Sequence, residues 1–401
     1  ENPLIISTTE DLVAFAKSVN GGNSFRGKTV KLSADVWLND TTGWKKWDRQ
    51  TKLKSCIPIG TSETPFEGTF DGGGHYIAGL FIKAGSETFC QGLFGFLKRA
   101  VVKNTRICFS HIIAYNYVGA LAGHISFNTQ ILNCSNESIV ENDRNFSGGL
   151  IGFSSGQNRI IGCRNYGRVY GHRCVGGIVG YFEGGSIYNS FNRGDIIGRY
   201  EHIGGIIGEF SEPYQKSVKN TGLKELPNDT VANCYNTGTI MARDVAGGIA
   251  GHINLHSIQV STWKVVFANY SSGKIRTIYP VVTDGLVGVY AYFTDSDNLI
   301  IPSVDRINRD GAACYWSEES CKMTTLRKPR FEGNKLRTDS WNKIMYGSMK
   351  IPDSFRYFSA DEMKQQSFVD LLNKWADKKK VFSLWSQDEK NVNNGFPVFI
   401  N

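Results

Sequence analysis

The chain has 401 residues, of which 41% are hydrophobic and 20% charged, so it can bury a large core and is unlike a disordered polypeptide. Its formal net charge of +8 is small for this length and its basic residues are scattered, so we expect no nucleic-acid partner. No apolar run reaches the roughly 18 residues that a membrane-spanning helix needs. No signal sequence opens the chain, and an upstream signal or lipid anchor could have been removed before Glu1.

Residues 1–55 predict an N-terminal cap that leads into a repetitive domain. Residues 7–22 have the pattern of a helix, with Thr8 or Thr9 as the N-cap and two glycines at the end. A strand-like segment follows at 29–38. The apolar face of the predicted helix consists of Leu12, Phe15, Ala16 and Val19.

A glycine-rich motif then recurs along the chain. It reads VGALAGHI at 118–125, SGGLIGFS at 147–154, VGGIVGYF at 175–182, IGGIIGEF at 203–210 and AGGIAGHI at 246–253. Counting the shorter GLFG and GLVG copies, the last glycines lie at 95, 123, 152, 180, 208, 251 and 288, so the gaps are 28, 29, 28, 28, 43 and 37 residues. This regularity indicates one repeated structural unit, with insertions in the last two copies.

A second element, such as IGCRNYGRV at 161–169 and ANCYNTGTI at 232–240, lies between the glycine motifs. Asn and Gly tolerate left-handed backbone and therefore predict tight corners. We expect the cysteine column to be small inward residues, with a Cys–Cys link between adjacent coils as the alternative. We expect the asparagine columns to be hydrogen-bonded amide stacks that satisfy the turn backbone. The aligned columns are Asn133, Gly162, Asn189 and Asn233; Cys134, Cys163, Ser190 and Cys234; and Asn136, Asn165, Asn192 and Asn236.

These units predict an all-β fold, a parallel β-helix or solenoid over 56–317 with short helical caps at both ends. A unit of about 28 residues without a helical period suits one coil with about three short strands, stacked about 4.8 Å from the next. Like residues then form ladders, and the aliphatic ladder predicted to fill the core is Leu150, Ile178, Ile206 and Ile249.

Insertions interrupt the period near 211–230, 254–264 and 290–311, and they predict loops that project from the coil. Residues 318–401 predict a C-terminal cap region with an amphipathic helix at 359–379 and a final strand at 395–400. The residues expected to face inward from this helix are Met363, Phe368, Leu371, Leu372 and Trp375.

The cysteine count is nine, so at least one cysteine is outside any internal disulfide. Cys314 and Cys321 are spaced so that they could close a small loop. The seven histidines are dispersed and show no zinc-type spacing with cysteine, so we expect no metal site and no cofactor.

Several of these stretches together resemble the GLUG-motif proteins of bacteria. The resemblance rests on ISTTEDLVAFAKSVNGG, IPIG at 57–60, PFEGTFDGGGHYIAGLFI at 65–82, the GGIVG-type repeats and the ending NNGFPVFI, and it covers nearly the whole chain. It implies a secreted or surface-exposed, right-handed parallel β-helix of the adhesin-like kind, and it supplies no catalytic residues.

If the coils stack, one column of aromatic and basic residues precedes each glycine motif at one-coil spacing. Such a strip could bind sugars or anionic glycans, because Arg pairs with carboxylate or sulfate groups. An ordinary solvated turn column remains the alternative. A second column follows the glycines, at His124, Phe153, Tyr181, Glu209 and His252, and the sequence leaves open whether it is exposed. The ligand-binding candidates are Tyr115, Arg144, His172, Tyr200 and Arg243.

The function predicted from these features is a secreted or cell-surface, adhesin-like binding protein. Its partner would be a glycan or a host or microbial surface protein held on one face of the solenoid. An alternative is a polysaccharide-active lyase or glycosidase that uses Glu201 and Asp244, which share a column about 5 Å apart, as in a retaining pair. A further alternative is a structural spacer that binds nothing.

Overall fold

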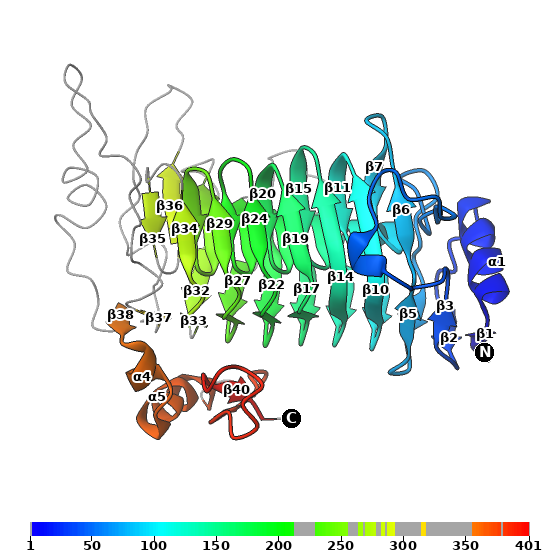
Figure 1. The fold of residues 1–401 in the computed structure, drawn as a ribbon. Helices are drawn as coiled ribbons and strands as arrows, with labels where there is room; N and C mark the ends of the chain where they lie inside the picture. Colours follow the sequence, from blue (N-terminus) through cyan, green and yellow to red (C-terminus); the bar gives the residue numbers. More distant parts are fainter. Residues whose placement is uncertain are drawn as a thin grey trace, which may run out of the picture.

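The computed structural model describes residues 2–211, 229–255, 264–267, 269–277, 282–284, 287–292, 314–317, 355–377 and 380–400. The strands stack coil upon coil from α1 at the N-terminal end, as the blue-to-yellow series in Figure 1 shows. The prediction of an all-β, parallel β-helix is therefore confirmed. Each complete coil passes through four ladders of strands, here called sheets A, B, D and C in chain order, whereas about three strands per coil were predicted.

Sheets A and B form two long walls of the solenoid, with nine and fifteen strands among the described residues. The strands of sheet A are β1 (Leu4–Ile6), β2 (Thr29–Leu32), β4 (Thr69–Asp71), β9 (Val101–Lys103), β13 (Gln130–Leu132), β17 (Asn158–Ile161), β22 (Gly185–Tyr188), β27 (Asp229–Ala232) and β32 (Lys264–Phe267). The strands of sheet B are β3 (Val36–Trp37), β5 (Tyr76–Ala78), β6 (Phe81–Lys83), β10 (Arg106–Ala114), β14 (Ser135–Asn142), β18 (Arg164–Asn165), β19 (Arg168–Gly171), β23 (Phe191–Asn192), β24 (Ile196–Gly198), β28 (Tyr235–Asn236), β29 (Ile240–Ala242), β33 (Asn269–Ser271), β34 (Ile275–Thr277), β37 (Cys314–Ser317) and β38 (Phe355–Phe358).

In the part of the chain that the structure describes, sheets D and C contain seven strands each, and the glycine motif joins a strand of sheet D to the following strand of sheet C. The strands of sheet D are β7 (Phe89–Gln91), β11 (Asn116–Gly119), β15 (Asn145–Gly148), β20 (Arg173–Gly176), β25 (Ile203–Gly204), β30 (Val245–Gly247) and β35 (Val282–Asp284). The strands of sheet C are β8 (Phe94–Lys98), β12 (Ala122–Ser126), β16 (Ile151–Ser155), β21 (Val179–Phe182), β26 (Ile207–Ser211), β31 (Ala250–Leu255) and β36 (Val287–Tyr292).

The glycine motif makes the turn from sheet D to sheet C, and one copy shows why side chains are excluded. A Cβ on Gly176 would lie 2.0 Å from the Val179 carbonyl oxygen, across the turn. A Cβ on Gly177 would lie 2.5 Å from Cγ of Asn192, and one on Gly180 would lie 2.6 Å from the Ser147 nitrogen in the preceding coil. Because real Cβ contacts are never this short, each glycine permits a separate close approach of the chain.

The predicted ladders account for the interior of the solenoid. The aliphatic ladder is fully buried, as predicted. The amide groups of the asparagine ladder are joined from coil to coil by hydrogen bonds of 2.7–2.8 Å, and Asn165 Nδ2 also donates to the Gly167 carbonyl oxygen at 2.9 Å. The amide stack therefore satisfies buried backbone at the turn, which confirms the prediction.

The two remaining columns also have the predicted roles. The corner column has left-handed backbone, with φ of 52° at Asn133, 67° at Gly162 and 51° at both Asn189 and Asn233. The cysteines of the next column are buried free thiols. Burial raises the pKa of the Cys163 thiol to about 12, so this thiol is protonated at neutral pH. The cysteines of this column therefore pack in the core and are not reactive nucleophiles.

Helix α1 (Thr9–Asn20) covers the N-terminal end of the solenoid (Figure 1). Thr8 is its N-cap and forms a capping box with Asp11, and Gly21 follows its last turn. Its buried residues are Leu12, Phe15 and Val19, as predicted. The short 3₁₀ helix η1 (Trp44–Lys46) follows β3.

The C-terminal helix predicted as one element consists of two, α4 (Ala360–Met363) and α5 (Gln366–Ala376). Ser359 and Glu362 form a capping box at the start of α4. On one continuous helix, positions 363 and 368 would point about 140° apart. The break between α4 and α5 allows Met363 and Phe368 to enter the same buried cluster. The predicted final strand is β40 (Val398–Phe399), which pairs antiparallel with β39 (Trp385–Ser386).

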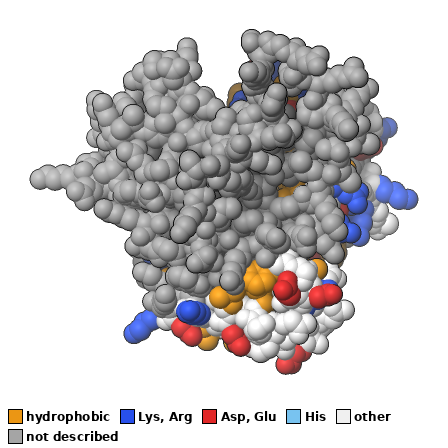
Figure 2. Space-filling model, turned by 90° about the vertical axis from the view of Figure 1, so that its left-hand side faces the viewer, with side chains coloured by type: hydrophobic (Ala, Val, Ile, Leu, Met, Phe, Trp, Pro, Cys, Tyr) orange, Lys and Arg blue, Asp and Glu red, His pale blue; other side chains and the backbone are white. Residues whose placement is uncertain are grey.

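This C-terminal segment packs along the side of the solenoid, below the coils in Figure 1. Trp385 Nε1 donates to Asn233 Oδ1 at 2.7 Å, and Asn189 Nδ2 donates to the Val381 carbonyl oxygen at 2.8 Å. The left-handed corner asparagines thus serve as its docking points. Its outer side, at the bottom of Figure 2, presents acidic and basic side chains beside a few hydrophobic ones.

Several sequence predictions lie outside the described residues. These are most of the three insertions, the Trp375 side chain, and the pairing of Cys314 with Cys321.

Candidate functional site

The five predicted ligand-binding residues occupy one corner of the solenoid in five successive coils. Each lies in the short connection between a strand of sheet B and the following strand of sheet D. We call this set the corner strip, and it consists of Tyr115, Arg144, His172, Tyr200 and Arg243.

Contacts between neighbouring coils organise the corner strip into two stacks. The Arg144 guanidinium lies 5.1 Å from the centre of the Tyr115 ring. The His172 and Tyr200 rings are stacked with centroids 5.3 Å apart, and the Arg243 guanidinium lies 4.8 Å from the Tyr200 ring. His172 and Arg243 lie against the Tyr200 ring, so a ligand would meet the edge of this ring more readily than its faces. The corner strip therefore offers a ligand ring edges and polar N–H and O–H groups.

The two carboxylates of the catalytic alternative lie beside the corner strip, one coil apart. The pairing of Ile203 with Ala246 places Glu201 and Asp244 in register. Glu201 forms an ion pair with Arg173 at 3.0 Å, and Asp244 Oδ2 lies 3.7 Å from Arg243 Nε. Partial burial and the nearby Glu201 charge raise the pKa of Asp244, although Arg243 opposes this shift.

The second column, which the sequence left open, lies on sheet C and is covered by sheet D. The Phe153 ring lies 5.2 Å from that of Tyr117, and the Tyr181 ring lies 4.7 Å from that of Phe146. We call the contact between these columns the D–C interface. It is half-buried in the coils that carry His124, Phe153 and Tyr181 and buried in those that carry Glu209 and His252.

The sheet D column of this interface has an unusual backbone. Successive coils have positive φ at Tyr117 (55°), Phe146 (64°), Cys174 (52°) and His202 (62°). Non-glycine residues rarely adopt this conformation, which costs on the order of 1 kcal/mol. Its repetition shows that contacts with sheet C offset this cost in each coil.

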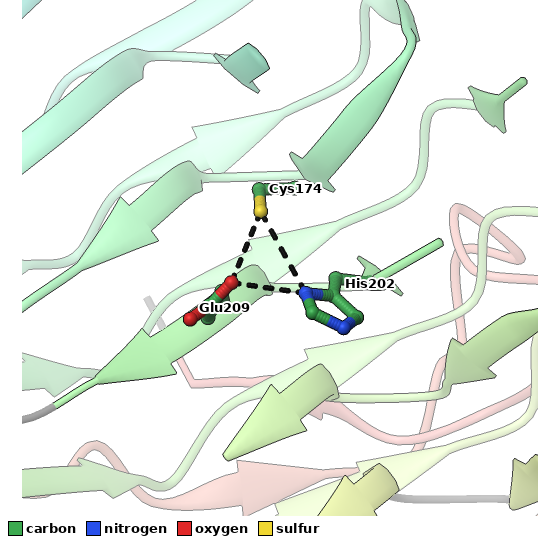
Figure 3. Close-up of side chains that lie close together, drawn as sticks. All are labelled: Cys174, His202 and Glu209. Carbon is green, nitrogen blue, oxygen red and sulfur yellow. Dashed lines mark hydrogen bonds and ion pairs between the residues drawn. The ribbon is translucent and has the colours of Figure 1, made fainter. Parts of the chain in front are cut away.

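A compact polar cluster occupies the later part of the D–C interface. Cys174 on β20, His202 immediately before β25, and Glu209 on β26 point toward one another (Figure 3). Glu209 Oε2 lies 2.9 Å from His202 Nδ1 and 3.2 Å from Cys174 Sγ, and Cys174 Sγ lies 3.8 Å from His202 Nδ1. His252, on β31, stacks on His202 with ring centres 4.1 Å apart.

The charges in this cluster depend on one another. Burial pushes the pKa of Glu209 upward, but the contacts with His202 and His252 outweigh it and hold that pKa well below its usual range. Burial and the Glu209 charge raise the pKa of the Cys174 thiol well above its ordinary value. Glu209 is therefore ionised and Cys174 is a neutral thiol in the metal-free protein.

This arrangement differs from that of a nucleophilic triad. In such a triad the imidazole uses its two nitrogens separately, one toward the nucleophile and one toward the carboxylate. In this cluster Cys174 and Glu209 both contact Nδ1 of His202. Cys174 is also only 1% exposed, so the cluster has neither the relay nor the access that a substrate needs.

Sequence analysis missed this cluster because its members belong to two columns and three coils. Glu209 and His252 share the sheet C column, but Cys174 and His202 lie on sheet D, at positions that the repeat aligns with Phe146. The available signal was a change of residue type within aligned columns, from aromatic residues to metal-binding and titratable ones.

A groove of about 650 Å³ lies at the N-terminal end, away from the corner strip. It runs between α1 and the first coils, and apolar residues such as Leu12, Leu38 and Ile59 line it. Among the described helices, none is long and apolar enough to cross a membrane.

Comparison with protein families agrees with the repeat pattern. The family model described as "The GLUG motif" matches residues 171–197. The chain contains a GLUG motif. In the structure this GLUG motif runs from the end of β19 to β24, so it corresponds to one coil that includes His172 and Cys174.

Two known proteins are similar to this GLUG-motif chain. Halomucin of Haloquadratum walsbyi is 29% identical over 154 residues, which are 38% of this chain and only 2% of halomucin. The crystal structure of a candidate immunoglobulin A1 protease from Bacteroides ovatus aligns with 99% of this chain and 92% of its own, with a TM-score of 0.53 and 17% identity. At that identity the structural similarity demonstrates a shared fold alone.

Proposed function

We propose that this protein is a secreted or cell-surface binding protein whose corner strip engages a glycan that carries carboxylate or sulfate groups. The observation that carries the proposal is the in-register placement of three aromatic and two arginine side chains along one corner of a rigid solenoid. The similarity to halomucin is consistent with an extracellular or cell-surface location.

The chemistry of the strip favours an extended, anionic ligand. Two Tyr–Arg contacts occur in it, Tyr115 with Arg144 and Tyr200 with Arg243. Packing against a ring orients the planar guanidinium, so less entropy is lost when it donates two hydrogen bonds to an oxyanion. Coils repeat about every 4.8 Å, so a linear polymer could meet similar groups in successive coils.

We expect the two stacks of the corner strip to contribute unequally to the affinity for an anionic glycan. Arg243 has the Asp244 carboxylate 3.7 Å away, which partly offsets its charge. Among the ion pairs of the described residues none involves Arg144, and the neighbouring Asp143 is paired with Arg49. We therefore expect the Tyr115–Arg144 stack to contribute more of the affinity for an anionic group than the Tyr200–Arg243 stack.

A glycan array that displays neutral, carboxylated and sulfated sugars tests this proposal with the purified chain. Binding is expected to the anionic glycans and to weaken as salt rises, because exposed charges are screened. The double variant Tyr115→Ala/Arg144→Ala should lose more binding than Tyr200→Ala/Arg243→Ala. The matched control is Tyr166→Ala/Arg159→Ala, which removes one exposed tyrosine and one exposed arginine outside the strip.

Each outcome has a defined meaning. Equal losses in the control and the strip variants would reject the strip as the site. Absence of binding to every glycan by folded protein would reject a glycan ligand and favour a protein partner or a spacer. If a bound glycan is cleaved and Glu201→Gln abolishes cleavage while binding persists, the protein is an enzyme that acts through the adjacent carboxylates.

A further inference from the structure

The donor atoms of the polar cluster already lie near the geometry of a zinc site. With Zn–S of 2.3 Å and Zn–N and Zn–O near 2.0–2.1 Å, tetrahedral ligands lie about 3.3 Å apart for N and O and about 3.5 Å apart for S with N or O. The corresponding distances here are 2.9, 3.2 and 3.8 Å among Cys174, His202 and Glu209. Each differs from the tetrahedral value by a few tenths of an ångström.

A fourth donor lies beside these three. His252 is 4% exposed, and its Nδ1 has no hydrogen-bond partner. This atom lies 3.7 Å from Glu209 Oε1, whereas Cys174 and His202 contact Glu209 Oε2. The His252 ring is stacked on that of His202, so its side chain must rotate before Nδ1 can reach an ion held by the other three residues. A buried imidazole nitrogen without a partner is costly, so its position calls for an explanation that packing does not give.

We propose that Cys174, His202 and Glu209 bind one Zn²⁺ ion, and that His252 turns away from its stack on His202 to supply the fourth ligand. A thiolate, two imidazoles and a carboxylate are the ligand types that zinc prefers. The charge also balances, because one thiolate and one carboxylate neutralise the two positive charges of the ion. The occupied site would therefore be neutral overall, which a buried position requires.

The grouping of the donor atoms supports coordination over simple packing. At the aligned positions of earlier coils, sheet D presents Cys90, Tyr117 and Phe146, and sheet C presents Phe96, His124, Phe153 and Tyr181. Metal-binding residue types therefore occur in both columns of the earlier coils as well. Among the described residues, however, only Cys174, His202 and Glu209 bring three donor atoms within 4.8 Å of one another.

The site fits a structural role. Four protein donors complete a tetrahedral ion, whereas catalytic zinc keeps one position open for water or substrate. The four side chains are between 1% and 8% exposed, which leaves no path for a substrate. The ligands come from three successive coils, so the ion would join β20, β25–β26 and β31. The inference is independent of whether the corner strip binds a glycan.

Cobalt substitution of the full chain gives the most direct test. The protein is stripped with a chelator, dialysed, and titrated with cobalt chloride and separately with zinc chloride. We expect one metal ion per chain, the intense visible bands of tetrahedral Co²⁺ and a thiolate-to-cobalt charge-transfer band. Zinc should displace the cobalt and raise the thermal unfolding midpoint, because a ligand that binds only the folded state stabilises it.

Variants assign the ligands. Cys174→Ala should abolish the charge-transfer band, and His252→Phe, which places a ring as in earlier coils, should raise the zinc Kd at least about tenfold. Cys163→Ala removes a buried cysteine that is not part of the cluster and should leave both readouts unchanged. Folded wild-type protein that shows neither tetrahedral cobalt bands nor stoichiometric zinc would overturn the proposal, even if a variant fails to fold. A charge-transfer band that survives Cys174→Ala would overturn the ligand assignment.

Discussion

The earlier and later coils fill the same D–C interface with different chemistry. In the earlier coils Tyr117 and Phe146 pack on Phe153 and Tyr181. In the later coils Cys174 and His202 meet Glu209 and His252. The backbone is the same in both regions, with positive φ on sheet D and in-register parallel pairing on sheet C.

The comparison separates the residues that maintain the backbone of each coil from the side chains that fill the D–C interface. Glycine turns and the asparagine ladder run through both regions and fix the distance between sheets D and C. Ring contacts stabilise the earlier region by about 0.5–1.5 kcal/mol for each pair beyond the burial of their area. The later region buries a carboxylate, which is unfavourable unless partners compensate its charge. The shared backbone thus permits either aromatic packing or a polar cluster.

The largest expected effect comes from changing the shared turn. In Gly152→Ala the new Cβ would lie 2.3 Å from the Val118 nitrogen, and in Gly208→Ala it would lie 2.4 Å from the Cys174 carbonyl carbon. Both contacts are with backbone, which cannot move aside as a flexible side chain can. We expect each variant to lower the free energy of unfolding by about 3 kcal/mol, as measured by urea denaturation.

Gly85→Ala is the matched control, because a Cβ there meets no heavy atom within 4 Å. Its expected effect lies within about 0.5 kcal/mol. If Gly152→Ala is destabilising and Gly208→Ala is tolerated, sheets D and C are not held at the same distance in both regions, and the comparison fails.

A smaller effect is expected from the asparagine ladder. Asn165 donates to Asn192 Oδ1 at 2.7 Å and to the Gly167 carbonyl oxygen at 2.9 Å, and it accepts from Asn136. Asn165→Ala leaves buried partners unsatisfied, so we expect a loss of about 2–3 kcal/mol in the free energy of unfolding. Thermal and urea midpoints measure this loss.

Asn236 occupies the same column in a later coil and accepts from Asn192 Nδ2 at 2.8 Å, but its own Nδ2 donates over longer distances, 3.2 Å to the Gly238 carbonyl oxygen and 3.5 Å to Ser271 Oγ. We therefore expect Asn236→Ala to cost less, about 1–2 kcal/mol. A greater loss at Asn236 than at Asn165 would contradict a ladder that is strongest in its middle.

The periodic parts of this structure were accessible from sequence because a solenoid repeats each contact once per coil. Alignment of the repeats was enough to place the amide stack of Asn165 and the corner residues Tyr200 and Arg243 in their columns. The same alignment could not identify the D–C interface, because side-chain direction there depends on positive φ at residues such as Phe146 and Cys174. Aromatic and cysteine residues carry no sequence signal for that conformation.

The other features that the sequence did not predict involve contacts between the repeating coils and the C-terminal segment, which is not part of the repeat. Asn189 meets Val381 and Asn233 meets Ser383, across separations of 192 and 150 residues. No repeat indicates such a pairing, so the C-terminal segment could be predicted as helix and strand but not as a unit docked on the side of the coils. The division of its helix likewise depends on that docking surface, because burial of both Met363 and Phe368 requires it.

The smallest expected effect is a difference in acid sensitivity within the aromatic region. His124 lies 4.3 Å from the Phe96 ring and 4.7 Å from the Phe153 ring, and its Nε2 contacts Ser155 Oγ at 2.8 Å. Burial among these rings lowers the pKa of His124 to about 3 from 6.5. Below pH 6.5 the unfolded chain therefore binds a proton that the folded protein does not, so this histidine reduces stability progressively between about pH 6.5 and pH 3.

His124→Phe should remove this acid sensitivity, because it continues the ring stack without a titratable group. At pH 5 the wild-type histidine costs about 1–2 kcal/mol relative to pH 7.5, so the fall in the thermal midpoint between these pH values should be smaller in the variant. Loss of the Ser155 hydrogen bond should make the variant slightly less stable at pH 7.5. Phe70→Leu is the control: it removes part of a fully buried ring elsewhere in the core and leaves the rings around His124 in place, so its midpoint should fall with pH as in the wild type. If His124→Phe retains the full wild-type pH dependence, the imidazole of His124 is protonated in the folded protein, and the rings of the earlier region of the D–C interface do not keep it neutral.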